Sequence, residues 1–355
     1  MACLGATVAS RYPAGRATAG RLCHDAGMNR PYKQVDVFTS VPYRGNALAV
    51  VLDGEGLGDA DMLRFANWTN LAETTFILPP TRPGADYRVR IFTTTTELPF
   101  AGHPTLGTAH AWLEAGGRSA RPGVLVQECG AGLIEVRTGS DAGDDTGRRL
   151  ALKAPPLVRS GPLEEDVLEW ALGGLGLRPE DVLDHQWVAN GPQWAGLLLR
   201  DADAVLALEP DFTALEGLEV GVIGAHATPG TRAAGYGGEG RQRPKGARAE
   251  LEPLPVRHRT GRAGAFEAAV STAPADYEVR AFCPGEGLPE DPVTGSLNAG
   301  LAQWLIPAGL APENYTVRQG TRLGRDGHVE VSSDAEGVWI AGQSVTCIDG
   351  TMRSH

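Results

Sequence analysis

Three side chains in this sequence have the chemistry needed to take, return or hold a proton: Glu73, His103 and Asp291. Glu73 lies in NLAETTFIL, just before an apolar strand, where partial burial would raise the pKa of its carboxyl group toward the working pH. From position alone, the favoured interpretation is a strand-end carboxylate satisfied by neighbouring threonines. His103 could carry a second proton or donate a hydrogen bond to a substrate, or simply cap a helix. Asp291 could bind a substrate amine or hydroxyl, or only hold the EDPVTGS turn.

Two glycine-containing turns come directly before predicted helices, at Gly102-His103 and at Gly295-Ser296. The first N–H groups of a helix have no partner within the helix and carry partial positive charge, so they attract carboxylates. If the two helix starts point at each other, they form a two-sided site for a small anion, and the glycines let the backbone approach it closely. Gly102 and Gly295 are therefore candidates for a substrate carboxylate site, whereas either turn taken alone is more often only structural.

The elements that must position these residues alternate between strand and helix patterns from about Tyr32 onward. The paired prolines at 155 and 156 indicate a domain boundary, and each side of it offers a strand, a glycine-containing turn and an apolar helix. Strands are predicted over 34–40, 46–52, 73–78, 86–92, 124–137 around a turn, 185–190, 196–200 and 277–282, and helices over 61–67, 102–117, 163–172 and from the 291–296 turn to 305.

Two segments break this alternation. Residues 1–31 have little with which to build a core, so we expect a disordered leader or a start assigned too early. Residues 228–264 are rich in Gly, Pro and Arg and predict an irregular insertion in the second domain, with a basic nucleic-acid arm as the less favoured alternative.

Composition narrows the class of protein. The chain of 355 residues is long enough for two domains, and its net charge of −11 argues against nucleic acid as the main partner. Its five cysteines are an odd number without CxxC or zinc-site spacing, which favours reduced thiols in a cytoplasmic protein and predicts no metal site. No apolar run is long enough to span a membrane, so we expect no membrane association.

Four motifs share order and spacing with a known family: NxxETTF at 70–76, GHPTLG at 102–107, EDPVTGS at 290–296 and QGTRLGRDG at 319–327. The opening QVDVFTSVPYRGNALAVVLDG is similar as well. Together they resemble the phenazine-biosynthesis (PhzF-like) family from about residue 32 to near residue 350, with one interruption. The resemblance implies an α+β, diaminopimelate-epimerase-like fold of two pseudo-symmetric domains, each a sheet wrapped around a central helix. Its expected domains are 32–155 with about 340–355, and 156–339.

The resemblance also implies an activity. The chain would be a cofactor-independent isomerase that moves a proton on a small carboxylated substrate, with a cyclic substrate as in the best-understood member. Glu73 would be the acid/base, His103 and Asp291 would act with it, and Gly102, Gly295 and Ser296 would surround the substrate. No metal or organic cofactor is expected, and a homodimer is expected from the family alone. A proton shift along one face of a ring needs only a single base, which Glu73 could supply.

Two alternatives remain open at this point. One is an amino-acid or hydroxy-acid racemase or epimerase with Glu73 and His103 as unlike bases. The other is a ligand-binding or regulatory protein on the same fold, without catalysis. Cys129, in a strand-turn-strand pattern, and Cys283, before Pro284, are interpreted as structural thiols.

Overall fold

A computed structural model describes residues 28–139, 149–227, 275–285 and 288–354. Its helices are α1 (Asp59–Thr69), α2 (Gly102–Glu114), α3 (Glu165–Leu175), α4 (Ala202–Leu206) and α5 (Gly295–Leu305). Its strands are β1 (Met28–Val37), β2 (Asn46–Val51), β3 (Glu73–Leu78), β4 (Tyr87–Phe92), β5 (Glu97–Leu98), β6 (Val124–Cys129), β7 (Gly132–Thr138), β8 (Arg149–Lys153), β9 (Arg159–Gly161), β10 (Val182–Ala189), β11 (Ala195–Leu199), β12 (Val220–Ala225), β13 (Tyr277–Phe282), β14 (Glu290–Asp291), β15 (Asn314–Gln319), β16 (Gly327–Asp334) and β17 (Gly337–Ser354).

The first group of strands closes on itself around α2. The pairings run from β17 to β1, β2, β3, β4, β6, β7 and β8 and return to β17; we call this ring with its helix the α2 barrel. Helix α2 contacts β1, β2, β3, β6, β8 and β17, and residues 103–111 of the helix are all buried. A side chain at Gly107 would come within 2.6 Å of Leu48, so this glycine allows the helix to lie close against the strands. Burial on every side holds the start of α2 in a fixed place.

The second group of strands packs around α5. The pairings run from β9 through β10, β11, β12, β13 and β15 to β16, and β16 pairs with the first part of β17; we call this the α5 sheet. Gly300 lies so close to β10 that a Cβ there would overlap the carbonyl oxygen of Val188. The short strand β14 pairs with the end of β13 and leads directly into α5. This order places Asp291 four residues before Gly295, at the start of the helix.

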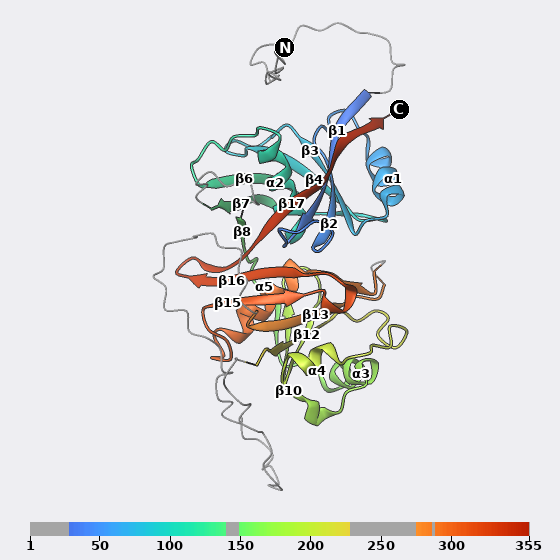
Figure 1. The fold of residues 1–355 in the computed structure, drawn as a ribbon, viewed down its shortest axis with the longest axis vertical. Helices are drawn as coiled ribbons and strands as arrows, with labels where there is room; N and C mark the ends of the chain where they lie inside the picture. Colours follow the sequence, from blue (N-terminus) through green and yellow to red (C-terminus); the bar gives the residue numbers. More distant parts are fainter. Residues whose placement is uncertain (1–27, 140–148, 228–274, 286–287, 355) are drawn as a thin grey trace, which may run out of the picture.

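A single long strand joins the two groups. Figure 1 shows β17 running from beside β16 up to β1, where it ends near the strand that begins the described chain. Along the way it also pairs with β8 through Trp339 to Gln343. The apolar core around α2 and the core around α5 belong to one buried cluster, so the two helices are held in one packed interior.

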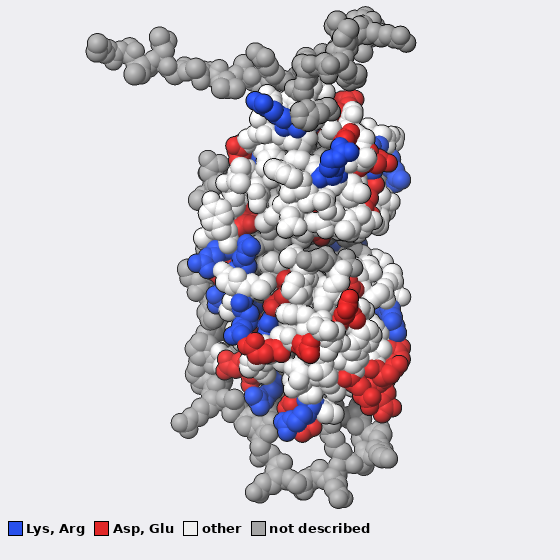
Figure 2. Space-filling view, turned by 90° about the vertical axis from the view of Figure 1, so that its right-hand side faces the viewer, with Lys and Arg blue, Asp and Glu red and all other residues white. Residues whose placement is uncertain are grey.

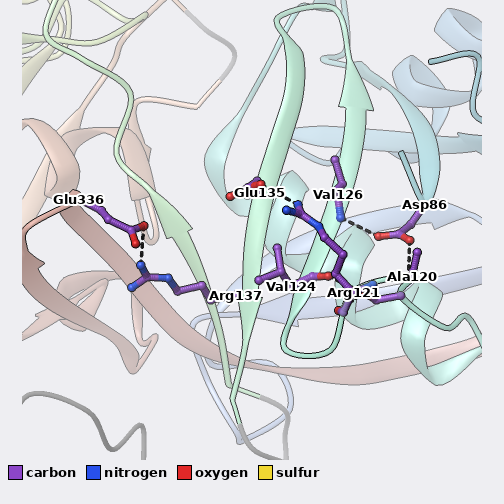
Figure 3. Close-up of polar contacts among 9 residues, drawn as sticks. Asp86, Ala120, Arg121, Val124, Val126, Glu135, Arg137 and Glu336 are labelled. Atoms are coloured by element: carbon purple, nitrogen blue, oxygen red, sulfur yellow. Dashed lines mark hydrogen bonds and ion pairs between the residues drawn. The ribbon is translucent and has the colours of Figure 1, made fainter. Parts of the chain in front are cut away.

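A charged contact on the α2 barrel ties it to the turn between β16 and β17. Arg137 in β7 forms ion pairs with Asp334 at 2.9 Å and with Glu336 at 2.7 Å, and its guanidinium group stacks on Trp339 at 3.4 Å from the ring centroid. Figure 3 shows Arg137 reaching toward Glu336, beside the hairpin of β6 and β7. Arg149 and Glu330 form a second ion pair between β8 and β16. These ion pairs hold β7 and β8 of the α2 barrel against β16 and the turn that follows it.

The surface carries both signs of charge. On the face drawn in Figure 2, acidic and basic side chains stand in separate small groups among large uncharged areas. In the described part of the chain, no helix is both long enough and apolar enough to cross a membrane.

The predicted leader, residues 1–31, extends too far, because its last four residues are part of a strand. Residues 28–31, expected to belong to a leader, are the start of β1, and Met28 pairs with Ser354 of β17. Strand pairing thus satisfies backbone groups in a segment whose composition predicted no structure. Residues 1–27 and the 228–264 insertion lie outside the described residues. The division into two pseudo-symmetric domains stays a prediction.

Candidate active site

Glu73 begins β3, the strand that lies parallel to β2 in the α2 barrel. The chain reaches it from α1 through Asn70, whose left-handed backbone (φ 55°) ends that helix. The residues that follow, Thr74 to Ile77, are buried, whereas the side chain of Glu73 keeps 17% of its surface exposed. Its Oε2 lies 3.2 Å from Nε2 of His103. The carboxylate is therefore close to an imidazole, and its Oε2 is buried although the side chain as a whole keeps some exposed surface.

His103 is the second residue of α2, and its side chain is buried. Burial lowers the pKa of His103 to about 3, because a charged imidazolium loses its hydration inside the protein. At neutral pH the ring is therefore uncharged. Its Nδ1 lies 3.4 Å from the amide nitrogen of Asn46, on the opposite side of the ring from Glu73.

Asp291 approaches the same place from the other group of strands. Its Oδ1 accepts a hydrogen bond from Asn46 Nδ2 at 2.8 Å, and its Oδ2 accepts one from the Thr294 hydroxyl at 2.6 Å. Burial raises the pKa of Asp291 to about 6, and the charge of neighbouring Glu290 adds to that shift, while the two hydrogen bonds oppose it. Such a carboxyl group titrates near neutral pH, where acid/base groups are useful.

The two predicted helix starts meet. A Cβ built on Gly102 would lie 3.7 Å from Cα of Gly295, and one built on Gly295 would lie 3.7 Å from the backbone nitrogen of His103. Neither N-cap residue, Ala101 or Thr294, places its side chain over the first turn of its helix. Two helix N-termini without side-chain caps thus face each other, an arrangement that favours a bound anion.

The remaining predicted residue, Ser296, is turned toward the α5 sheet. Its hydroxyl oxygen accepts a hydrogen bond from Trp194 Nε1 at 3.1 Å, and its carbonyl oxygen accepts one from Asn190 Nδ2 at 2.8 Å. Both contacts hold the first turn of α5. Cys129 is buried, and burial raises the pKa of its thiol, which fits the structural interpretation.

The prediction from sequence missed a set of buried amides and hydroxyls that support these groups. Gln319 accepts hydrogen bonds from Thr294 N (3.1 Å) and Asn298 Nδ2 (2.9 Å), and donates to the Asp291 carbonyl oxygen (3.1 Å) and the Thr294 hydroxyl (2.9 Å). Thr294 and Gln319 both lie within the quoted motifs, which was the available signal. Asn46 follows Gly45 at the start of a strand, and an asparagine in that position does not by itself indicate a role in the active site. Within the described ranges, no group of three or more His, Cys, Asp or Glu residues could hold a metal ion.

A barrel closed around a helix, with a carboxylate and an imidazole at two opposed helix starts, agrees with the family suggested by the motifs. The chain belongs to the phenazine biosynthesis-like (PhzC-PhzF) family, whose sequence profile matches residues 35–238 and 251–350. It is an isomerase by class, since relatives across almost the whole chain carry isomerase names.

Individual relatives make the comparison concrete. The trans-2,3-dihydro-3-hydroxyanthranilate isomerase of Pseudomonas fluorescens is 30% identical over 328 residues, covering 90% of this chain and 98% of that protein. A Schizosaccharomyces pombe protein named antisense-enhancing sequence 1 is 31% identical over 326 residues, covering 90% and 97%.

Solved structures confirm the fold class. The structure of a PhzF-family phenazine biosynthesis protein from Enterococcus faecalis has a TM-score of 0.65 at 21% identity, covering 92% of this chain and 99% of that one. A Bacillus anthracis protein of the same family gives a TM-score of 0.65 at 20% identity, with the same coverage. These likenesses show that the chain has the overall fold of the solved PhzF-family proteins, and its strands and helices agree with the expected α+β class.

Proposed function

We propose that this isomerase moves a proton on a small, cyclic, carboxylated substrate, with Glu73 removing and returning the proton. The observation that carries the proposal is the 3.2 Å contact between the Glu73 carboxylate and the His103 imidazole at the start of α2. A carboxylate beside a neutral imidazole has a neighbour that can hold or pass on a proton.

The substrate carboxylate would bind at the two helix starts. Because Gly102 and Gly295 have no side chain, a ligand at the helix starts can approach the backbone closely. The partial positive charge at the N-termini of α2 and α5 favours an anion there. Asp291, held by Asn46 and Thr294, would orient a hydroxyl or amine of the substrate next to that carboxylate. These roles support a substrate of the kind named for the Pseudomonas fluorescens relative.

The position of His103 bears on the epimerase alternative. An epimerase needs two bases on opposite faces of one carbon, whereas Glu73 and His103 contact each other and would approach a substrate from the same side. This favours a proton shift along one face over inversion of a stereocentre by this pair.

The proposal is tested by incubating the protein with trans-2,3-dihydro-3-hydroxyanthranilate in deuterated water and following isomerisation and deuterium incorporation by NMR. Glu73→Gln should lower the rate by about 10² to 10⁴-fold, because the amide keeps the shape but cannot accept the proton. Glu135→Gln is the matched control, since Glu135 lies on the outside of the same barrel, paired with Arg121. Wild-type rates in Glu73→Gln would contradict the role of Glu73, and inversion without a double-bond shift would support the epimerase instead.

A further inference from the structure

Asn46 connects the two acid/base groups that come from opposite sides of the site. It begins β2, is only 2% exposed, and points its amide nitrogen at three atoms. Nδ2 lies 2.8 Å from Oδ1 of Asp291, 2.9 Å from the carbonyl oxygen of Val293 and 3.4 Å from Nδ1 of His103.

The chemistry of these neighbours fixes which end of the amide faces them. A carboxylate oxygen and a backbone carbonyl oxygen only accept hydrogen bonds, so the group between them must be the donor NH₂. Turning the amide by 180° would place its oxygen against two other oxygens at hydrogen-bond distance. The two acceptor oxygens of Asp291 and Val293 therefore require that the NH₂ end of the Asn46 amide faces them.

The orientation of Asn46 in turn fixes the proton on His103. An amide NH₂ cannot accept a hydrogen bond, so the ring nitrogen facing it, Nδ1, must present its lone pair. In a neutral imidazole the proton then lies on Nε2, the nitrogen 3.2 Å from Glu73. The same amide thus satisfies the Asp291 carboxylate and places the His103 proton on Nε2, the ring nitrogen that lies near Glu73.

We propose that Asn46 is a positioning residue that selects the Nε2–H form of His103 and holds Asp291 as a hydrogen-bond acceptor across the site. The groups facing His103 are Glu73 and Asn46, and those facing Asp291 are Asn46 and Thr294. The two hydrogens of the amide are shared among Asp291, Val293 and His103, so Asn46 has little capacity left to donate to a substrate.

Glu290, the other charged neighbour of Asp291, is already neutralised. Arg280 pairs with it through two hydrogen bonds of 2.9 and 2.8 Å, and both side chains are buried. The negative charge of Glu290 therefore acts on Asp291 only in weakened form, which leaves Asn46 and Thr294 as the direct partners that hold the carboxylate.

Nitrogen NMR of histidine-labelled protein near neutral pH tests the proton position without a substrate, with His103 signals assigned by their loss in His103→Gln. The wild type should show a protonated Nε2 and an unprotonated Nδ1. Asn46→Ala should give a mixture of both tautomers, and Asn46→Asp, which presents an acceptor, should move the proton to Nδ1. Asn298→Ala is the control, because it also removes a buried amide that donates to Thr294 and Gln319 but lies away from His103.

A wild-type ring that is charged or carries its proton on Nδ1 would overturn the inference, and so would an Asn46→Ala ring that keeps the wild-type tautomer. The wild-type spectrum decides the first point even if a variant does not fold.

The kinetic consequence rests on the proposed function of Glu73. Asn46→Ala should lower kcat by about 10- to 100-fold, part of the usual contribution of acid/base catalysis, with KM changed by less than about threefold. A loss confined to KM would make Asn46 a substrate ligand and overturn the positioning role. If the wild type does not act on the tested substrate, the proposed function fails, while the NMR result on His103 still stands.

Discussion

The protonation state of His103 predicts how the stability of the protein depends on pH. Two effects compete at this ring: burial disfavours the charged form, and the Glu73 carboxylate 3.2 Å away favours it. Burial dominates and lowers the pKa of His103 to about 3, whereas an unfolded histidine titrates near about 6.5. Between these values the unfolded chain binds a proton that the folded protein does not, so stability falls as pH falls.

The size of the effect follows from the same two values. At about pH 4.5, two units below the unfolded pKa, the folded state has lost about 2.7 kcal/mol relative to about pH 7.5, at about 1.36 kcal/mol per unit. His103→Gln has no imidazole to titrate, so its free energy of unfolding lacks this loss. Urea unfolding of both proteins at each pH should therefore show that the difference in free energy of unfolding between wild type and variant changes by about 2.7 kcal/mol between about pH 7.5 and about pH 4.5. Asp291, whose raised pKa adds stability as pH falls below about 6, is common to both proteins and largely cancels.

The opposite outcome is equally clear. If the contact with Glu73 dominated, the folded pKa of His103 would lie above 6.5. The wild type would then lose stability relative to His103→Gln as pH rises through neutrality. A difference between the two proteins that does not change between about pH 7.5 and 4.5, or that changes in that opposite sense, would refute a neutral, buried imidazole.

Further predictions concern packing around the site. Gly295→Ala should fold with a stability change below about 1 kcal/mol, because its Cβ meets atoms only at 3.5 Å or more, yet weaken substrate binding between the helix starts, as measured by KM. Gly300→Ala should abolish cooperative thermal unfolding, because the Cβ overlaps the β10 backbone. Arg280→Met should cost about 3–5 kcal/mol in urea unfolding by leaving the Glu290 charge buried, and adding Glu290→Gln should recover most of it; equal stability of the single and double variants would contradict this. Arg137→Ala, which breaks partly exposed ion pairs, should cost only about 1 kcal/mol in the same assay, and a loss above about 3 kcal/mol would show a larger role.

The sequence predicted the local elements around the site well, because their signals are local. The helix after Gly102 was expected to end at Gly116 and Gly117; it ends at Glu114, and Gly116 has the left-handed φ of 94° that favours glycine. The strand at ETTFIL begins at Glu73 as expected. The three acid/base candidates were chosen because each lies in a motif shared with the family; the structure brings them close together, and their roles stay a prediction.

Thr294 and Gln319 lie within the quoted motifs, but the contacts of Gln319 and Asn46 could not be predicted, because their partners are distant in sequence. Asn46 contacts Asp291 across 245 positions, and only the closed barrel and the α5 sheet together bring them into hydrogen-bond distance. Residues 28–31 were missed for the same reason, since their order comes from pairing with the end of β17 and not from their own composition.

The long strand β17 has a consequence for how this protein is made. It supplies the wall between β1 and β8, yet it is the last of the ring's strands to leave the ribosome, more than 180 residues after β8. While the nascent chain is still being extended, the strands around α2 have two unsatisfied edges, and the longest-range pairings form only at the end. The helix start that carries His103 therefore reaches its final surroundings only after synthesis has passed residue 354.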